Sequence, residues 1–219
     1  MRGKASHKVA ERILNTYGQR TNGSRLRDMQ SKSYMPGGDT RSSTYFFPYP
    51  IYLERGEGCY VHDCDGNEYI DFINNYTSLI HGHAHPRIIE AAYEQLRVGS
   101  ALGTPVELQF RLAEHLCSRI PSMEMLRYCS SGTEATLFAM RAARAFTGRE
   151  IIIKMDGGYH GSHDYVRVNL SLDPDGEGRH QPRLEGRGIP SGVLDATLVA
   201  PFNDLDAVEA LIDAHRDRV

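Results

Sequence analysis

Apolar residues recur at helical spacing in three stretches in the middle of the chain. Residues 106–120 carry an apolar residue at every fourth position from 108 onward, a spacing typical of an amphipathic helix. Residues 86–98 begin with Pro86, which suits a first helical turn because its missing N–H would have no partner there. Residues 134–146 are rich in alanine and end before Gly148, a residue type that often follows a helix. The pattern therefore predicts three helices.

Shorter apolar runs predict strands. Residues 51–53, 59–62 and 68–72 are separated by glycines and by the turn Asp-Gly-Asn at 65–67, a strong hairpin signal, so they predict an antiparallel meander. The run 150–155 is almost entirely apolar, which is typical of a strand in a parallel sheet. Two more strands are expected at 125–129 and 197–200.

The remaining segments complete an alternating plan. Residues 6–18 and 204–214 predict helices, the second with Asp204 as a candidate N-cap. Residues 20–50 and 171–192 are rich in Gly, Pro and polar residues and predict irregular chain. Strands that alternate with helices indicate an α/β fold. The last helix is not followed by a strand, so we expect the natural domain to be longer than this chain.

Composition narrows the class of protein. The 219 residues carry a net charge of −3 and 24% charged residues, values of an ordinary globular domain. They exclude collagen, a disordered tail and a coiled coil, and no apolar run is long enough to span a membrane. The N-terminus has no apolar core of a secretory signal. The mildly acidic balance predicts neither a nucleic-acid partner nor a membrane partner.

The cysteines favour a reducing environment. The four residues stand at positions 59, 64, 117 and 129, so the Cys-x-x-Cys spacing of common zinc and redox sites is absent. Cys117 and Cys129 fall in apolar patterns, where we expect them to be buried as small hydrophobic residues. A cytoplasmic location fits this usage best.

A candidate anion site lies between the predicted strand 125–129 and the helix after it. Ser130, Ser131, Gly132 and Thr133 occupy this turn. Helix N-termini present free N–H groups and a positive dipole end, and hydroxyls beside a glycine allow close approach, so the turn suits a phosphate. The alternative is plain capping, with Ser or Thr as N-cap and an acidic residue in the first turn.

A second motif, Asp-Gly-Gly-Tyr-His-Gly at 156–161, follows the buried strand 150–155 directly. Ligands of open α/β sheets bind at the carboxyl ends of the strands, where this motif would place the flat ring of Tyr159. The alternative is a glycine-rich turn with a tyrosine on the surface.

Three histidines alternate in the segment His81-Gly-His-Ala-His-Pro. They could share one face of an extended strand and so suggest a metal site. Carboxylate and cysteine partners are not nearby in the sequence, and Pro86 starts a helix at once. We therefore predict no metal site, and packing at the helix entry is the alternative interpretation.

Together these segments resemble a known family. The residues that carry the resemblance are Pro-Gly-Gly at 36–38, ERGEGCYVHDCDGNEYIDF, HGHAHP, SSGTEATLFAMRAARAFTGR, IIIKMDGGYHG and APFNDLDAVEALI. In this order and spacing they are similar to class III pyridoxal-phosphate aminotransferases. The branch is that of glutamate-1-semialdehyde aminomutase and the β-amino-acid aminotransferases. The resemblance extends over residues 30–219 and is most specific over 128–161.

The resemblance implies a fold and a cofactor site. The fold is fold type I, with a large, mostly parallel-sheet domain and a smaller α/β domain, in a homodimer. It implies pyridoxal 5'-phosphate as cofactor, with Ser131, Gly132 and Thr133 holding the phosphate. Tyr159 would stack on the pyridine ring, with His160 beside it. Both roles agree with the physical chemistry of a helix N-terminus and of an aromatic plane.

The resemblance also implies two substrate contacts. Arg41 corresponds to the position that β-amino-acid aminotransferases use for a carboxylate, and Arg is well shaped to bind a carboxylate with two hydrogen bonds. The aminomutase uses the position occupied here by Thr44. Tyr76 corresponds to an aromatic residue of the aminomutase substrate pocket. A solvated loop charge is the alternative interpretation of Arg41.

The family implies a division into residues 1–85, part of the smaller domain, and residues 86–219, the first part of the large domain. The lysine that binds the cofactor covalently and the aspartate that pairs with the pyridinium nitrogen belong to family motifs that lie beyond Val219. We therefore expect no catalytic residue in this chain, and Lys154 is a poor substitute because the family has no such lysine on that strand.

The sequence thus predicts amino-group transfer on a carboxylate-bearing amino acid, with this chain carrying the N-terminal part of the enzyme and inactive by itself. Two alternatives stay open. One is a glutamate-1-semialdehyde 2,1-aminomutase, which is an isomerase. The other is a non-catalytic fragment or a module that binds a phosphate ligand.

Overall fold

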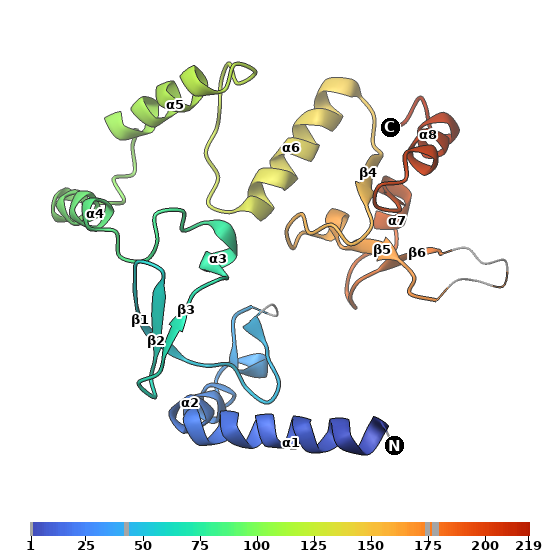
Figure 1. Ribbon diagram of the computed structural model, residues 1–219. Coiled ribbons are helices and arrows are strands. Elements are labelled where there is room, and N and C mark those ends of the chain that lie inside the picture. The colour runs from blue at the N-terminus through green and yellow to red at the C-terminus, as the bar shows by residue number, and fades with distance from the viewer. Residues whose placement is uncertain (1, 42–43, 174–175, 177–179) are drawn as a thin grey trace. The chain divides into compact units, whose positions relative to one another are not determined.

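The structure is a computed structural model that describes residues 2–41, 44–173, 176 and 180–219. Contacts divide the chain into two units, Met1–Pro105 and Val106–Val219 (Figure 1). The division at residues 85 and 86 that the resemblance implies refers to the domains of the family fold, and it stays a prediction.

The first unit begins with helix α1 (Arg2–Arg20), which contains the predicted helix and extends it at both ends. Helix α2 (Asn22–Ser31) follows, in a segment that the sequence predicts to be irregular, so that prediction is wrong there. The helix forms because a residue distant in the sequence caps its first turn. Asp65 accepts hydrogen bonds from the N–H groups of Gly23 and Ser24 at 2.5 and 2.9 Å. This carboxylate caps the helix from another part of the chain, because the side chain of the local N-cap residue Thr21 makes no hydrogen bond to the first turn.

The predicted meander is confirmed. After the short 3-10 helix η1 (Pro36–Gly38), strands β1 (Leu53–Glu57), β2 (Tyr60–Asp63) and β3 (Glu68–Ile70) form an antiparallel sheet in the order β1-β2-β3. The first strand begins and ends later along the chain than the sequence predicts. The turn before β3 contains the expected Asp-Gly pair.

The hairpin between β2 and β3 is organised around one buried carboxylate. Asp63 is 3% exposed and accepts the backbone N–H groups of Asp65 and Asn67 at 3.0 and 2.8 Å. It also accepts the Asn67 side chain at 2.9 Å and the Tyr69 hydroxyl at 2.8 Å. Burial raises the pKa of Asp63, but these hydrogen bonds together bring it below its ordinary value of 3.8. Burial and this carboxylate raise the pKa of Tyr69 to about 12.

A left-handed turn and a helix complete the first unit. Element α3 (Asn74–Thr77) has positive φ at all four residues, between 46° and 68°, a conformation that residues other than glycine rarely adopt. Helix α4 (Pro86–Val98) begins and ends where the sequence predicts.

The second unit opens with helices α5 (Glu107–Arg119) and α6 (Gly132–Thr147), both within a few residues of their predicted bounds. Gly148 ends α6 in the left-handed conformation, at φ 69°. The predicted strand at 125–129 is wrong, because no strand of the described chain pairs with this segment. Cys117 and Cys129 are half-buried, which corrects the expectation that they are buried.

Strands β4 (Ile152–Met155) and β7 (Thr197–Ala200) form the predicted parallel pair, with Ile152 opposite Thr197. The segment 171–192, expected to be a loop, contains strand β6 (Pro182–Leu184), which pairs antiparallel with β5 (Val168–Leu170). The loop prediction is wrong over β6, because these residues form a strand by pairing with β5, which local sequence does not show.

Short elements connect these strands and close the unit. The 3-10 helix η3 (Asp164–Val166) precedes β5, and helix α7 (Val193–Ala196) precedes β7. Helix α8 (Leu205–Ala214) is capped by Asp204, whose carboxylate accepts the N–H of Ala207 at 3.0 Å, as predicted. The core around β5 and β7 consists of Val168, Val193 and Val199, packed against Leu170, Leu184, Ile189 and Leu194.

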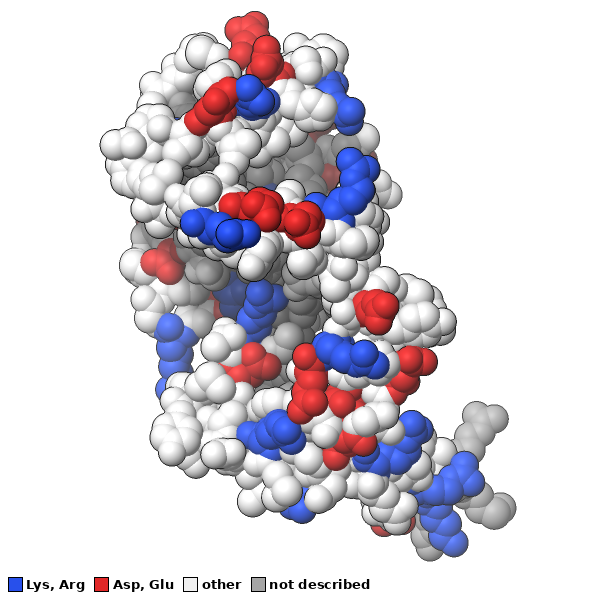
Figure 2. Space-filling model, turned by 90° about the vertical axis from the view of Figure 1, so that its left-hand side faces the viewer, with Lys and Arg blue, Asp and Glu red and all other residues white. Residues whose placement is uncertain are grey.

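The structure thus has the α/β class that the sequence predicts. Among the described residues, no helix is long and apolar enough to cross a membrane. On the face shown in Figure 2, basic and acidic side chains are interspersed, with no broad field of one sign.

Candidate functional site

The start of α6 carries both features that the sequence suggests, a helix cap and free N–H groups. Ser131 is the N-cap, and its hydroxyl accepts the N–H of Glu134 at 3.2 Å. The Glu134 carboxylate in turn accepts the N–H of Ser130 at 2.7 Å. The capping interpretation is therefore realised. It leaves the N–H groups of Gly132 and Thr133 in the first helical turn, where no intrahelical acceptor exists.

Space is open beside these N–H groups. Apart from the neighbouring residues and the backbone of α6 itself, no described atom lies within 4 Å of the place where a Cβ on Gly132 would stand. A ligand oxygen can therefore approach the backbone, at the end of the helix where the dipole favours negative charge. Capping and anion binding are compatible at this turn.

The loop after β4 lies directly against the first turn of α6. Ser162 donates its N–H to the Thr133 hydroxyl at 3.1 Å, and the Thr136 hydroxyl donates to the carbonyl of His160 at 2.7 Å. Gly161 is buried, and a Cβ there would stand 2.8 Å from both Cα and Oγ1 of Thr133. The two motifs that the sequence analysis treats separately therefore meet in space.

This loop forms a pocket of about 190 Å³, which we call the Tyr159 pocket. Tyr159 itself is 76% exposed and so presents its ring for contact. The ring of His160 folds over Gly158, whose added Cβ would lie 2.7 Å from the imidazole Nε2. The pocket is lined by Gly157, Gly158, Tyr159, His160, Gly161, Val166, Arg167 and Glu185.

Two further groups at this place carry no signal in the sequence. The Thr136 hydroxyl lies 3.2 Å from Nε2 of His163, and burial lowers the pKa of that imidazole. Nδ1 of His163 is buried and has no hydrogen-bond partner in the described part of the chain. Arg167 and Glu185 form an ion pair at 3.0 Å in the pocket wall. His163, Arg167 and Glu185 lie in segments with no recognisable motif, so only the folded structure shows that they belong to this site.

Lys154 is fully engaged within the structure. Its ammonium donates to the carbonyl of Val168 at 2.7 Å and to the side-chain oxygen of Asn169 at 2.8 Å. Burial lowers the pKa of this amine. These two acceptors hold the lysine in the protein interior, and the expectation that it does not replace the family's lysine stays a prediction.

Arg41 and Tyr76 belong to the first unit. The Arg41 N–H donates to Asp39 at 3.1 Å, and the Asp39 carboxylate also accepts the Thr44 hydroxyl at 2.6 Å. The hydrogen bond from the Thr44 hydroxyl, followed by those from the N–H groups of Arg41 and Thr40, holds the pKa of Asp39 below its ordinary value. The Arg41 side chain is exposed and forms no ion pair within 4 Å with any described residue.

Tyr76 lies in the left-handed turn α3, at φ 56°, and is 53% exposed. Asp71 holds the start of this turn, because its carboxylate accepts the N–H groups of Ile73 and Asn74, both at 2.9 Å. Residues held in rarely populated conformations cluster at binding sites, which is in line with a functional surface here.

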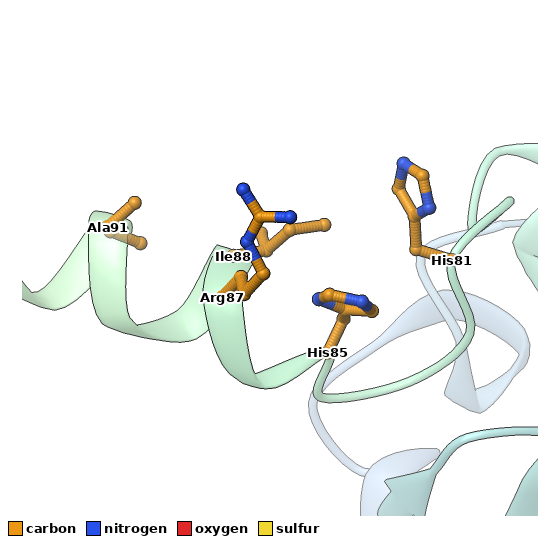
Figure 3. Close-up of a pocket in the computed structure, with 6 residues that line it drawn as sticks. His81, His85, Arg87, Ile88 and Ala91 are labelled. Atoms are coloured by element: carbon orange, nitrogen blue, oxygen red, sulfur yellow. The ribbon is translucent and has the colours of Figure 1, made fainter.

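The histidine segment leads into the start of α4. His83 pairs with Asp71 at 2.7 Å. The rings of His81 and His85 lie 5.5 Å apart and, with Arg87 and Ile88, line a pocket of about 770 Å³ (Figure 3). No group of three metal-ligating side chains occurs among the residues that the structure describes.

Comparison with known proteins identifies the family. Residues 42–173 match the family Aminotransferase class-III, a match that covers more than half of the chain. The chain belongs to the class III aminotransferases. The matched segment contains the turn at the start of α6 and the Tyr159 pocket from Gly157 to Val166.

Relatives and solved structures agree with this assignment. The chain is 43% identical over 190 residues to a glutamate-1-semialdehyde 2,1-aminomutase of Methanocaldococcus jannaschii, over 87% of this chain and 44% of that protein. It resembles an omega-transaminase from Sphaerobacter thermophilus with a TM-score of 0.85 and 45% identity, over 90% of this chain and 45% of that one. The chain thus spans less than half the length of each of these two proteins.

Two other solved structures bear on the site. A transaminase with PLP bound matches with a TM-score of 0.83 and 41% identity, over 91% of this chain and 46% of that chain. A beta-phenylalanine aminotransferase from Variovorax paradoxus matches with a TM-score of 0.82 and 32% identity, over 97% of this chain and 45% of that one. The chain therefore has the fold type I architecture that the sequence predicts.

Proposed function

We propose that the protein transfers amino groups to and from a carboxylate-bearing amino acid with pyridoxal 5'-phosphate, and that this chain supplies the phosphate and ring contacts of the cofactor site. One observation carries the proposal. The free N–H groups at the start of α6 and the exposed ring of Tyr159 belong to segments that contact each other through Thr133 and Ser162. Such a pair of features suits a phosphate attached to a flat heterocycle.

The residues present fit this cofactor. Ser131, Gly132 and Thr133 would hold the phosphate through hydroxyls and N–H groups, and Tyr159 would stack on the ring with His160 beside it. When bound, the cofactor supplies an electron sink for the substrate's amino carbon. Tyr159 would cover one face of the bound ring and so help to orient it.

We place no catalytic residue of the reaction in this chain. The family's covalent lysine and pyridinium-pairing aspartate have no counterpart in the matched motifs, and Lys154 is held by Val168 and Asn169. We therefore expect the 219-residue chain to be inactive by itself. Similarity to the family supports a homodimer in the cytoplasm for the working enzyme.

Cofactor retention tests the site. Thr133→Ala removes a hydroxyl that would donate a hydrogen bond to the charged phosphate. We therefore expect the binding free energy of the cofactor to weaken by about 1.5–3 kcal/mol, which is roughly 10- to 150-fold in affinity. Tyr159→Ala removes the stacking ring, and we expect a loss of about 0.5–1.5 kcal/mol beyond the area lost. Affinity for pyridoxal phosphate is measured by equilibrium dialysis of the protein in the form that its gene encodes.

The matched control is Tyr93→Ala, which removes a similarly exposed tyrosine from α4. It should bind the cofactor like the unaltered protein. Wild-type affinity in both Thr133→Ala and Tyr159→Ala would contradict the site assignment.

The substrate class rests on Arg41. Its exposed guanidinium is free of ion pairs among the described residues and can bind a carboxylate bidentately. The position agrees with an aminotransferase that acts on a β-amino acid, and the similarity to a beta-phenylalanine aminotransferase supports this choice. The second candidate is a glutamate-1-semialdehyde aminomutase, which the 43% identity to such an enzyme favours.

Arg41→Ala separates a substrate contact from a solvated charge. We expect turnover of carboxylate-bearing amino donors to fall by roughly tenfold or more, because a charged hydrogen bond contributes about 1.5–3 kcal/mol. Simple amines, which lack the carboxylate, should keep their rates. Steady-state kinetics of the naturally expressed enzyme measure both classes, with the exposed Arg12→Ala as control. Equal losses for both donor classes would rule out the role.

A further inference from the structure

Lys154 carries a charge into the interior of the second unit. It lies in β4 opposite Val199 of β7, and only 5% of its surface is exposed. A buried ammonium is costly unless hydrogen bonds replace its hydration. The Val168 carbonyl and the Asn169 amide oxygen supply them, at 2.7 and 2.8 Å. These acceptors fix where the cation lies.

Asn169 connects this cation to the loop after β4. Its amide oxygen also accepts the N–H of Gly157 at 3.1 Å, and its amide nitrogen donates to the Glu185 carboxylate. Glu185 is the partner of Arg167 in the ion pair of the pocket wall. Gly157, Arg167 and Glu185 all line the Tyr159 pocket. A continuous series of contacts therefore runs from the buried cation to the pocket.

We infer that Lys154 is a positioning residue for the ring end of the cofactor site. Through Asn169 it holds Gly157, two residues before Tyr159, and so sets the tyrosine against the pyridine ring. This inference rests on the proposed function and adds to it a residue that does not itself touch the cofactor.

Lys154 and Glu185 together determine the direction of the Asn169 amide. With an ammonium at its oxygen and a carboxylate at its nitrogen, the amide cannot turn over without reversing both contacts. The oxygen therefore stays in place for the N–H of Gly157, whose φ of 70° is one that glycine adopts readily and residues with a Cβ rarely do. Without the cation, Glu185 alone fixes the direction of the amide, so the acceptor of the Gly157 N–H is held less firmly.

A separate contact holds the phosphate end of the site. The bond between Ser162 and Thr133 joins the loop to α6, and Asp156 independently accepts the N–H of Leu170 at 2.8 Å. Loss of Lys154 should consequently disturb ring binding and leave phosphate binding intact. A general loss of structure would weaken both.

Two probes separate the two ends of the site. Pyridoxamine phosphate carries ring and phosphate but no aldehyde, so it cannot bond covalently to a lysine. Inorganic phosphate has no ring. Dissociation constants are measured on the protein in the form that its gene encodes, after removal of the cofactor. Binding of pyridoxamine phosphate is followed by the fluorescence of this ligand, and binding of inorganic phosphate by its competition with pyridoxamine phosphate.

For Lys154→Met we expect pyridoxamine phosphate to bind roughly 2- to 12-fold more weakly, the range of an aromatic contact, with phosphate affinity unchanged. Asn169→Ala keeps the lysine and removes the acceptor of Gly157, so it should show the same split even if Lys154→Met folds poorly. Equal weakening for both probes, or no weakening in Asn169→Ala, would overturn the inference.

A double-mutant cycle identifies the route. If Lys154 acts through Tyr159, the protein with both Lys154→Met and Tyr159→Ala should bind pyridoxamine phosphate no more weakly than Tyr159→Ala alone. Additive losses would overturn this route. If the unaltered protein bound neither probe, the proposed cofactor site itself would be overturned. If the unaltered protein bound both probes and Lys154→Met left this binding unchanged, the inference about Lys154 alone would be overturned.

Discussion

Gly161→Ala should detach the loop after β4 from α6 and weaken cofactor binding. Its Cβ would stand 2.8 Å from the Cα and Oγ1 of Thr133, and a backbone atom cannot yield as a flexible side chain can. The φ of 107° adds strain for any residue with a Cβ. Overpacking and backbone strain each cost about 1–3 kcal/mol, so we expect the free energy of unfolding to fall by about 2–5 kcal/mol.

Denaturant unfolding and pyridoxamine phosphate titration measure the two effects together. The control is Gly192→Ala, because Gly192 has an ordinary φ of −60° and no atom within 4 Å of an added Cβ. It should leave binding unchanged and could raise stability by about 0.4–1 kcal/mol through the unfolded state. Normal stability and normal binding in Gly161→Ala would show that the loop does not need its contact with Thr133.

Asp63→Ala should produce a comparable loss of stability in the first unit. The substitution leaves four donors without their acceptor: the N–H groups of Asp65 and Asn67, the Asn67 amide and the Tyr69 hydroxyl. A buried donor left unpaired costs about 1–3 kcal/mol. Water can reach some of these groups after truncation, so we expect a total of about 3–5 kcal/mol. Thermal or denaturant unfolding measures it.

The pH dependence gives an independent reading of the same carboxylate. The pKa of Asp63 is lower in the folded chain than its ordinary 3.8, so the folded state favours the ionised form. Its stabilising contribution is complete above the unfolded pKa and is lost as the pH falls through the folded pKa. Asp63→Ala should remove this part of the acid sensitivity.

The exposed Asp213, whose partner Arg216 lies one turn away on the surface, provides the control as Asp213→Ala. Its effect should stay within about 0.5 kcal/mol. A similarly small effect for Asp63→Ala would refute the organising role of the buried carboxylate.

Local chemistry explains what could be predicted without the fold. Pro86 and the alanine-rich stretch before Gly148 define helices because capping and backbone preference act within a few residues. The Asp204 cap follows the same rule. The phosphate turn and the tyrosine loop were each recognisable because glycines, hydroxyls and an aromatic ring stand together in the chain.

Contacts between distant residues decided the rest. Asp65 caps the helix at residues 22–31 from a distance. Residues 182–184 form a strand because they pair with β5. Residues 125–129 have no partner strand in the described chain. None of these partners can be read from local spacing. The meeting of Thr133 with the loop near Gly161 likewise depends on how β4 and α6 pack.

The sequence by itself determined the family, the main helices, the antiparallel meander and the two halves of the candidate cofactor site. Only the tertiary structure showed that these halves touch, that Lys154 is bound to Asn169, and that Tyr76 lies in a left-handed turn. The physical reason is the range of the interactions. Helix propensity, capping and turn chemistry act over a few residues, whereas burial and hydrogen bonds between segments depend on folding of the chain as a whole.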